Sequence, residues 1–238
     1  MRLTDVARAR RDGSLAVLEG FHALKHAVRF GGEILGAWTA DPDALEALRG
    51  SMAPDVELSV EAVGEEELAR VVPRAQVVAV ARRPVRPHPD VLIAADDPAP
   101  LVLLEEPRHL GNLGAAIRVA AGADAGGVLT TGHQDPWHPD AIRGAAGLHF
   151  ALPVYRINRL PKGPRPLLAL DPDGERFDPR AVPPGAILAF GTERGGLSPA
   201  LLERADARLA LPMAPGVSSL NLATAVSATL FALRLLSD

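Results

Sequence analysis

The order of apolar and polar positions predicts an α/β module in the first part of the chain. Short apolar runs alternate there with stretches of helical period. The expected helices are 20–30, 42–48 and 65–71, and the expected strands are 34–39, 56–60 and 76–81. Alternation on this scale is typical of a small sheet covered by helices.

A proline-rich stretch follows this module. Three prolines stand within six residues, at Pro84, Pro87 and Pro89. Proline fixes φ and has no amide hydrogen, so we expect neither helix nor strand pairing here. The sequence therefore predicts an N-terminal domain over 1–83, a linker over 84–97 and a C-terminal domain over 98–238.

Beyond the linker, the pattern of strand, glycine-containing turn and helix repeats. The expected strands are 101–104, 127–131, 167–170, 187–190 and 208–211, and the expected helices are 113–121 and 220–236. Apolar runs bounded by glycine or proline are typical of buried parallel strands. We expect an α/β domain with a mainly parallel sheet, which would bind ligands at the carboxyl ends of its strands.

Composition excludes several classes of chemistry. The chain has no cysteine, which removes disulfides, thiolate nucleophiles and the commonest structural zinc ligands, and we expect no metal site. No apolar run approaches the roughly 18 to 20 residues needed to span a bilayer, and no apolar stretch of signal-peptide type follows the first arginines. We expect a cytoplasmic protein without a membrane partner.

The charge balance gives no general attraction to nucleic acid. The formal net charge is −4, whereas phosphate binding depends on local cation density. Lysine occurs only at Lys25 and Lys162, so nearly all positive charge is arginine, which can make bidentate contacts to phosphate. A genome rich in G and C would produce the same bias.

Three glycine-rich segments carry the candidate chemistry, and the first is 106–118. Asn112 is expected to cap the following helix, and Gly114 permits a close backbone approach. Arg118 falls near Asn112 on that helix, within an otherwise apolar stretch. A capped helix explains Asn112 but does not require Arg118, so spacing alone leaves both a plain helix and a functional site open.

The second segment, 190–198, has the glycine spacing of a phosphate-binding loop at Gly191 and Gly196. Leu197 occupies the position where such a loop needs lysine, which argues against a nucleoside triphosphatase. An ordinary tight turn would also explain the glycines. Glu193 and Arg194 nevertheless lie in a loop at a strand end, where binding residues often concentrate.

The third segment, 211–225, turns through Pro215 and Gly216 and begins the last helix near 218–221. Small side chains and exposed amides at a helix start suit an oxygen-rich ligand, although they also serve as a plain helix cap. None of the three segments identifies an activity by itself.

Taken together and in this order, the segments resemble the three motifs of the SpoU/TrmH family of RNA 2′-O-ribose methyltransferases, in the SPOUT class. The matching stretches are Asn-Leu-Gly-Ala-x-x-Arg at 112–118, Gly-Thr-Glu-x-x-Gly-Leu-Ser at 191–198, and Leu-Pro-Met with Ser-Leu-Asn at 211–221. Residues 139–154 are similar to the family's stretch between motifs. Residues 18–24 resemble the start of an N-terminal domain similar to ribosomal protein L30e.

The resemblance implies a C-terminal trefoil knot, a homodimer and an N-terminal domain that binds the RNA substrate. It also implies S-adenosylmethionine as cofactor and RNA as partner, ribosomal RNA being preferred over transfer RNA. The residues matched to cofactor binding are Thr130, Gly191, Leu211, Met213 and Leu220.

The residues matched to catalysis are Arg118, Asn112, Glu193, Ser219 and Asn221. Arginine is a poor base because its pKa lies above about 12. We therefore expect Arg118 to bind a phosphate and stabilise negative charge on the 2′-oxygen, while an RNA phosphate or water accepts the proton. The other four polar residues are expected to orient Arg118 and the ribose.

Three alternatives remain at this stage. A relative could methylate a base nitrogen instead of a ribose, since the knotted class includes both. A non-catalytic RNA-binding or ribosome-assembly protein could retain the fold, although intact polar motif residues argue against a decayed site. A nicotinamide-dependent dehydrogenase would need a G-x-G-x-x-G after a strand, which the chain lacks.

Overall fold

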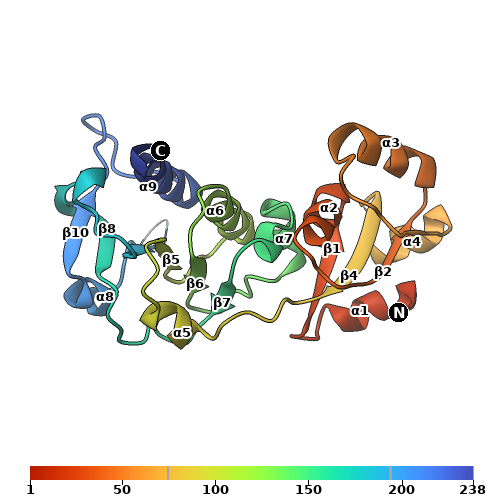
Figure 1. Ribbon diagram of the computed structural model, residues 1–238, viewed down its shortest axis with the longest axis horizontal. Helices are drawn as coiled ribbons and strands as arrows, with labels where there is room; N and C mark the ends of the chain where they lie inside the picture. Colours follow the sequence, from red (N-terminus) through yellow and green to blue (C-terminus); the bar gives the residue numbers. More distant parts are fainter. Residues whose placement is uncertain (74, 193–194, 238) are drawn as a thin grey trace. The chain divides into compact units, whose positions relative to one another are not determined.

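The computed structural model describes residues 1–73, 75–192 and 195–237. The chain forms two compact units. The N-terminal unit is Met1–Val85 with Trp137–Ala151, and the C-terminal unit is Arg86–Pro136 with Leu152–Asp238. Each unit contains its own sheet (Figure 1).

The N-terminal unit is a four-stranded sheet in the order β1-β4-β2-β3. Its strands are β1 (Leu15–Glu19), β2 (Ile34–Thr39), β3 (Glu61–Ala62) and β4 (Val77–Arg82), and β4 pairs antiparallel with β1 and β2. A short 3₁₀ turn, η1 (Leu3–Asp5), comes first in the chain. The helices that follow in this unit include α1 (Val6–Ala9), α2 (Phe21–Arg29), α3 (Pro42–Met52) and α4 (Glu65–Val71). The predicted α/β module is confirmed.

One predicted strand of this unit is wrong. Residues 56–60 form no strand, and the chain joins the sheet only at β3, beside β2. The indole Nε1 of Trp38 donates to the Glu61 carboxylate at 3.0 Å, which helps to fix the pairing at that point. Alternation of Val56, Leu58 and Val60 suggested a strand, but only Val56 is buried.

The segment Trp137–Ala151 packs on the N-terminal unit instead of the C-terminal domain expected over 98–238. It holds α7 (Pro139–Gly144) and a 3₁₀ turn, η2 (Leu148–Phe150). Arg143 pairs with Glu19 at 3.0 Å, and Nδ1 of His26 lies 2.7 Å from the carbonyl oxygen of Ala146. Gly147 has φ +78° and lies against the backbone of Ala23, where a β-carbon would not fit.

The expected linker over 84–97 contains a helix, α5 (Pro89–Ala94). Proline is tolerated in the first turn of a helix because the amide there has no partner within the helix. His88 accepts a hydrogen bond from the Asp90 amide at 3.4 Å, and Ile93 is buried in the core of the C-terminal unit. Pro89 therefore begins this helix, and the prolines before it do not prevent the helix from forming.

The C-terminal unit is built on a six-stranded sheet in the order β10-β8-β9-β5-β6-β7, and every neighbouring pair is parallel. Its strands are β5 (Leu101–Leu104), β6 (Gly127–Thr130), β7 (Val154–Arg156), β8 (Leu167–Arg176), β9 (Ile187–Phe190) and β10 (Ala207–Ala210). The expected parallel α/β fold is confirmed.

Helices cover both faces of this sheet. They are α6 (Leu110–Gly122), α8 (Pro199–Arg204) and α9 (Leu222–Ser237), with α5 and the turn η3 (Pro179–Ala181). Figure 1 shows α6 and α9 side by side on one face, with α5 and α8 on the other. The second face is buried by alternate strand residues such as Leu101 and Leu103, packed with Ile93 and Leu201.

Strand β8 continues six residues beyond its predicted end at Leu170. Asp171-Pro172-Asp173-Gly174 has the composition of a turn, yet it extends the strand beside β10, where the register shifts between Arg208 and Leu209. A β-carbon at Gly174 would lie 2.5 Å from the carbonyl carbon of Arg208. Glycine thus permits the close approach of the two backbones.

No helix in the described ranges combines the length and apolar character needed to cross a bilayer. Nor does this part of the chain gather three or more histidine, cysteine, aspartate or glutamate side chains in an arrangement that could hold a metal ion.

Replacing Leu103 by alanine should destabilise the C-terminal unit. Leu103 is fully buried in the central strand β5, and such truncations leave a cavity that costs about 2–5 kcal/mol. Urea unfolding measures the loss. Val91→Ala, at a 57% exposed position of the same unit, is the control and should change the free energy of unfolding by less than about 0.5 kcal/mol. Equal effects of the two changes would contradict the assigned core.

Candidate functional site

The three glycine-rich segments leave the same edge of the parallel sheet. The first follows β5, the second follows β9 and the third follows β10. Since β5 and β9 are direct neighbours, their carboxyl ends lie together, and the Glu105 amide donates to the Phe190 carbonyl at 2.9 Å. The edge predicted for ligand binding is therefore where the segments meet.

The second segment closes on itself. Thr192 and Gly196 exchange two backbone hydrogen bonds of 3.1 Å, and the Gly195 amide donates to Oγ1 of Thr192 at 2.9 Å. Gly196 has φ +62°, and a β-carbon at Gly191 would overlap the backbone of Gly196. The glycines are required by this narrow loop. Glu193, predicted as a catalytic residue, lies outside the described residues.

The end of this loop is fastened to the end of β5. The Glu105 carboxylate accepts from the Ser198 amide at 2.6 Å and from the Ser198 hydroxyl at 2.7 Å. The same hydroxyl accepts from the Leu201 amide at 3.3 Å and so caps α8. Glu105 was missed in the sequence, where its only signal was an acidic residue directly after a buried strand.

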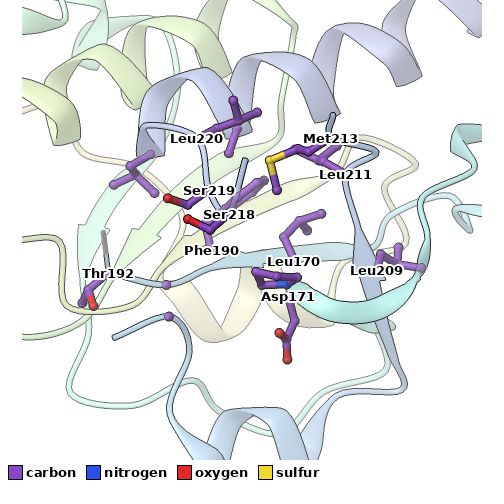
Figure 2. Close-up of a pocket in the computed structure, with 15 residues that line it drawn as sticks. Leu170, Asp171, Phe190, Thr192, Leu209, Leu211, Met213, Ser218, Ser219 and Leu220 are labelled. Carbon is purple, nitrogen blue, oxygen red and sulfur yellow. The ribbon is translucent and has the colours of Figure 1, made fainter. Parts of the chain in front are cut away.

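A cavity of about 390 Å³ lies between the second and third segments. Figure 2 shows the side chains that line it. They are Leu170, Asp171, Pro172, Phe190, Gly191, Thr192, Gly196, Leu209, Leu211, Met213, Ser218, Ser219, Leu220, Leu222 and Ala225. Four of the predicted cofactor residues, Gly191, Leu211, Met213 and Leu220, are brought together here. We call this space the loop cavity.

The loop cavity has an apolar lining with a few polar groups. Hydroxyls come from Thr192, Ser218 and Ser219, and the carboxylate comes from Asp171 at the point where β8 was expected to end. This combination suits a largely apolar ligand that also carries polar and positively charged groups. Asp171 was not singled out in the sequence because its surroundings have the composition of a turn.

Thr130, the fifth predicted cofactor residue, does not line the loop cavity. It ends β6, which is separated from β9 by β5 in the sheet. The residue is fully buried, and its Oγ1 has no hydrogen-bond partner among the described residues. Its position at a strand end was predicted correctly, but the strand is too far along the sheet to contribute a wall.

Two of the predicted catalytic residues contact one another. Nδ2 of Asn221 donates to Oδ1 of Asn112 at 3.0 Å, which joins the first and third segments. The prediction that Asn112 caps the helix is wrong, because α6 begins at Leu110 with His109 in the cap position. Asn112 lies inside the first turn, so its side chain contacts the third segment instead of an amide of its own helix.

Arg118 is exposed on α6 and does not line the loop cavity. Six residues of helix rotate by about 240° beyond a full turn, so Arg118 and Asn112 face different directions. Within the described residues, Arg118 forms no ion pair. Arg118 and Asn112 are six positions apart on the same helix, and neither lines the loop cavity, whereas Ser219 does.

Residues 99–231 match the family model described as the SpoU rRNA Methylase family. The chain belongs to this family. The match covers all three segments and the six strands of the C-terminal sheet. The family resemblance expected from the motifs is confirmed.

Individual relatives agree with this assignment. The chain is 31% identical over 196 residues to the 23S rRNA (uridine(2479)-2′-O)-methyltransferase of Streptomyces viridochromogenes, covering 76% of this chain and 65% of that protein. A 2′-O-ribose methyltransferase structure aligns with TM-score 0.71 and 26% identity over 98% of this chain and 96% of the other. The fold also matches S. viridochromogenes AviRb in complex with AdoMet, with TM-score 0.78 and 23% identity over 99% and 96% of the two chains.

The chain spans between about half and two thirds of the length of the curated relatives, with 65%, 52% and 57% of three of them covered. The family match itself covers residues 99–231.

Replacing Gly191 by alanine should open the second segment. The added methyl group would overlap the backbone of Gly196, and overpacking of this kind costs about 1–3 kcal/mol. Urea unfolding measures the loss. Gly111→Ala is the control, because a β-carbon there meets no atom within 4 Å. An unchanged Gly191 variant would contradict the closed form of the loop.

Proposed function

We propose that this chain is an S-adenosylmethionine-dependent methyltransferase that modifies a ribose 2′-hydroxyl of RNA, with ribosomal RNA preferred over transfer RNA. The observation that carries the proposal is the loop cavity, which two motif segments build at the carboxyl edge of a parallel sheet. Relatives are named as 2′-O-methyltransferases of 23S rRNA and of tRNA, which supports ribose over base methylation.

The loop cavity fits the cofactor in size and in chemistry. Its volume of about 390 Å³ lies within the range of roughly 300–1,000 Å³ common for small-molecule sites. Leu211, Met213 and Leu220 offer an apolar slot for adenine and the methionine chain, and the narrow loop at Gly191 exposes main-chain groups to it. Asp171 can pair with the positive charge of the ligand. When bound, S-adenosylmethionine would supply an activated methyl group.

The protein must align a weak nucleophile and stabilise its developing charge. We assign Asn112, which accepts from Asn221, and Ser219, which lines the loop cavity, to positioning the ribose, with Glu193 of the second segment assisting. Arg118 binds an RNA phosphate through its planar guanidinium group and stabilises the 2′-oxygen. The proton passes to an RNA phosphate or to water.

In a homodimer, Arg118 would lie beside the partner chain and complete a catalytic site together with it. The last helix, α9, exposes Phe231, Leu235 and Leu236, and Leu235 is 74% exposed. Large apolar side chains grouped on one helix favour burial against a second copy. Since α9 packs beside α6, an interface there places Arg118 next to the partner chain. A trefoil knot formed by the second and third segments belongs to the same proposal.

The N-terminal unit is proposed to select the RNA as an L30e-like domain, with 1–83 as its continuous part, 84–97 as the connection and 98–238 as the methyltransferase domain. No described residue of its four-stranded sheet lines the loop cavity. With ribosomal RNA as the substrate, the proposed location of the protein is the cytoplasm.

Isothermal titration with S-adenosylmethionine tests the cofactor site. Leu220→Trp should fill the loop cavity and weaken binding at least about 10-fold, a cost near 1.4 kcal/mol. Val217→Trp, on the same segment but outside the cavity lining, is the matched control and should bind like the wild type. Wild-type protein that binds no cofactor would favour the non-catalytic alternative.

Removal of the Arg118 guanidinium should impair turnover without affecting cofactor binding. Loss of one group that stabilises developing negative charge costs about 10²–10³ in rate. Transfer of a labelled methyl group to unmodified ribosomal RNA transcribed in vitro measures Arg118→Ala, with Arg180→Ala as the charge-matched control. Nucleoside analysis by mass spectrometry then distinguishes ribose from base products. Full turnover by Arg118→Ala would reject the assigned role.

A further inference from the structure

A second cavity, of about 520 Å³, lies at the carboxyl ends of β5, β6 and β7 within the C-terminal unit. We call it the arginine cavity. Its lining residues are Glu105, Glu106, Thr131, Gly132, His133, Arg156, Ile157, Asn158, Arg159, Leu160, Ser198, Ala200, Leu201 and Arg204. It shares no lining residue with the loop cavity.

The positive charge of the arginine cavity is not neutralised within the described residues. Arg156 donates to the His133 carbonyl at 3.0 Å, and Arg204 donates to the carbonyls of Leu160 and Pro161 at 2.8 and 3.1 Å. These acceptors are uncharged. None of Arg156, Arg159 and Arg204 forms an ion pair with a described carboxylate.

Two carboxylates also line this cavity. Both oxygens of Glu105 are already engaged by Ser198, at 2.6 and 2.7 Å. Glu106 is exposed, and its backbone amide donates to the Thr131 hydroxyl at 3.1 Å. The arginines therefore exceed the carboxylates, and their exposed guanidinium groups keep free donors for an anion. Planar guanidinium groups match phosphate oxygens through two parallel hydrogen bonds.

The second segment separates the two cavities. Gly191, Thr192 and Gly196 line the loop cavity, while Ser198, at the end of the same segment, lines the arginine cavity. The bond from Ser198 to Glu105 holds this shared wall in place. A polyanion in the arginine cavity would thus run directly beside the loop that borders the methyl-donor site.

We propose that the arginine cavity binds phosphodiester groups of the RNA strand, on nucleotides next to the one that is methylated. This inference rests on the proposed function. Arg156 and Arg159 make the phosphate contacts, and exposed Asn158 offers an amide to a neighbouring ribose or base. Arg204 has a second task, because it holds the backbone at Leu160 and Pro161.

Fluorescence anisotropy with a labelled 12-nucleotide oligouridylate tests the proposal over a series of salt concentrations. Each phosphate contact to a single strand contributes about 0.7 to the slope of log affinity against log salt. The double variant Arg156→Gln/Arg159→Gln should lower the slope by about 1.4 and weaken binding at low salt. Arg204 is left intact so that the fold around Leu160 is preserved.

Arg176→Gln/Arg180→Gln is the matched control. Both arginines are exposed in the same unit, and neither lines a cavity described above. This variant should retain the wild-type slope. Thermal unfolding of both variants verifies that they remain folded. A slope equal to wild type in the Arg156/Arg159 variant, or an equal loss in the control, would overturn the assignment.

Two further measurements separate the possible ligands and the possible failures. Uridine 5′-monophosphate, at equal phosphate concentration, should displace the oligomer poorly, and efficient displacement would assign the cavity to free nucleotides instead of a strand. Titration of the Arg156/Arg159 variant with S-adenosylmethionine should match wild type. Absence of cofactor binding in wild type would reject the proposed function, whereas an unchanged salt slope rejects only the phosphate site.

Discussion

The contact between Glu105 and Ser198 is the constraint on which the functional edge of the sheet depends. It joins residues 93 positions apart, one at the end of β5 and one at the start of α8. A carboxylate that accepts from both an amide and a hydroxyl forms charge-assisted hydrogen bonds, which are stronger than neutral ones. Together with the Thr192 and Gly196 backbone bridge, this contact fixes the described parts of the second segment against β5. One short loop can therefore form a wall of two different cavities.

Much of the C-terminal fold was predictable because buried parallel strands are short apolar runs between glycines or prolines. The strands 101–104 and 187–190 were predicted to the residue. The errors occurred where tertiary contacts override local composition. Asp171 to Gly174 forms an irregular stretch inside β8, because β10 pairs with β8 both before it, at Leu168 and Ala169, and after it, at Glu175 and Arg176. Likewise, nothing local in 139–144 could reveal that α7 contacts β1 and belongs to the N-terminal unit.

The structure brings together four of the residues matched to cofactor binding, but only one of the described residues matched to catalysis lines the same cavity. Gly191 and Leu211 stand directly after strands, whose ends must meet at one edge, and Met213 and Leu220 belong to the segment that leads from β10 to α9. The bond between Asn112 and Asn221 spans 109 positions, so no local spacing could indicate it. Arg118 lies on α6 outside the loop cavity, so its proposed role depends on the RNA or on a second copy of the chain.

The net charge of the chain does not describe the local charge at a binding site, because it ignores which charged side chains neutralise one another. In the N-terminal unit, Arg29 pairs with Asp55 at 2.6 Å and Arg82 with Glu33 at 3.0 Å, so these cations offer little to phosphate. In the arginine cavity, the guanidinium groups of Arg156 and Arg204 instead contact uncharged carbonyls. Phosphate affinity depends on uncompensated local charge. A chain with net charge −4 can thus present a cationic groove, provided its carboxylates are paired elsewhere.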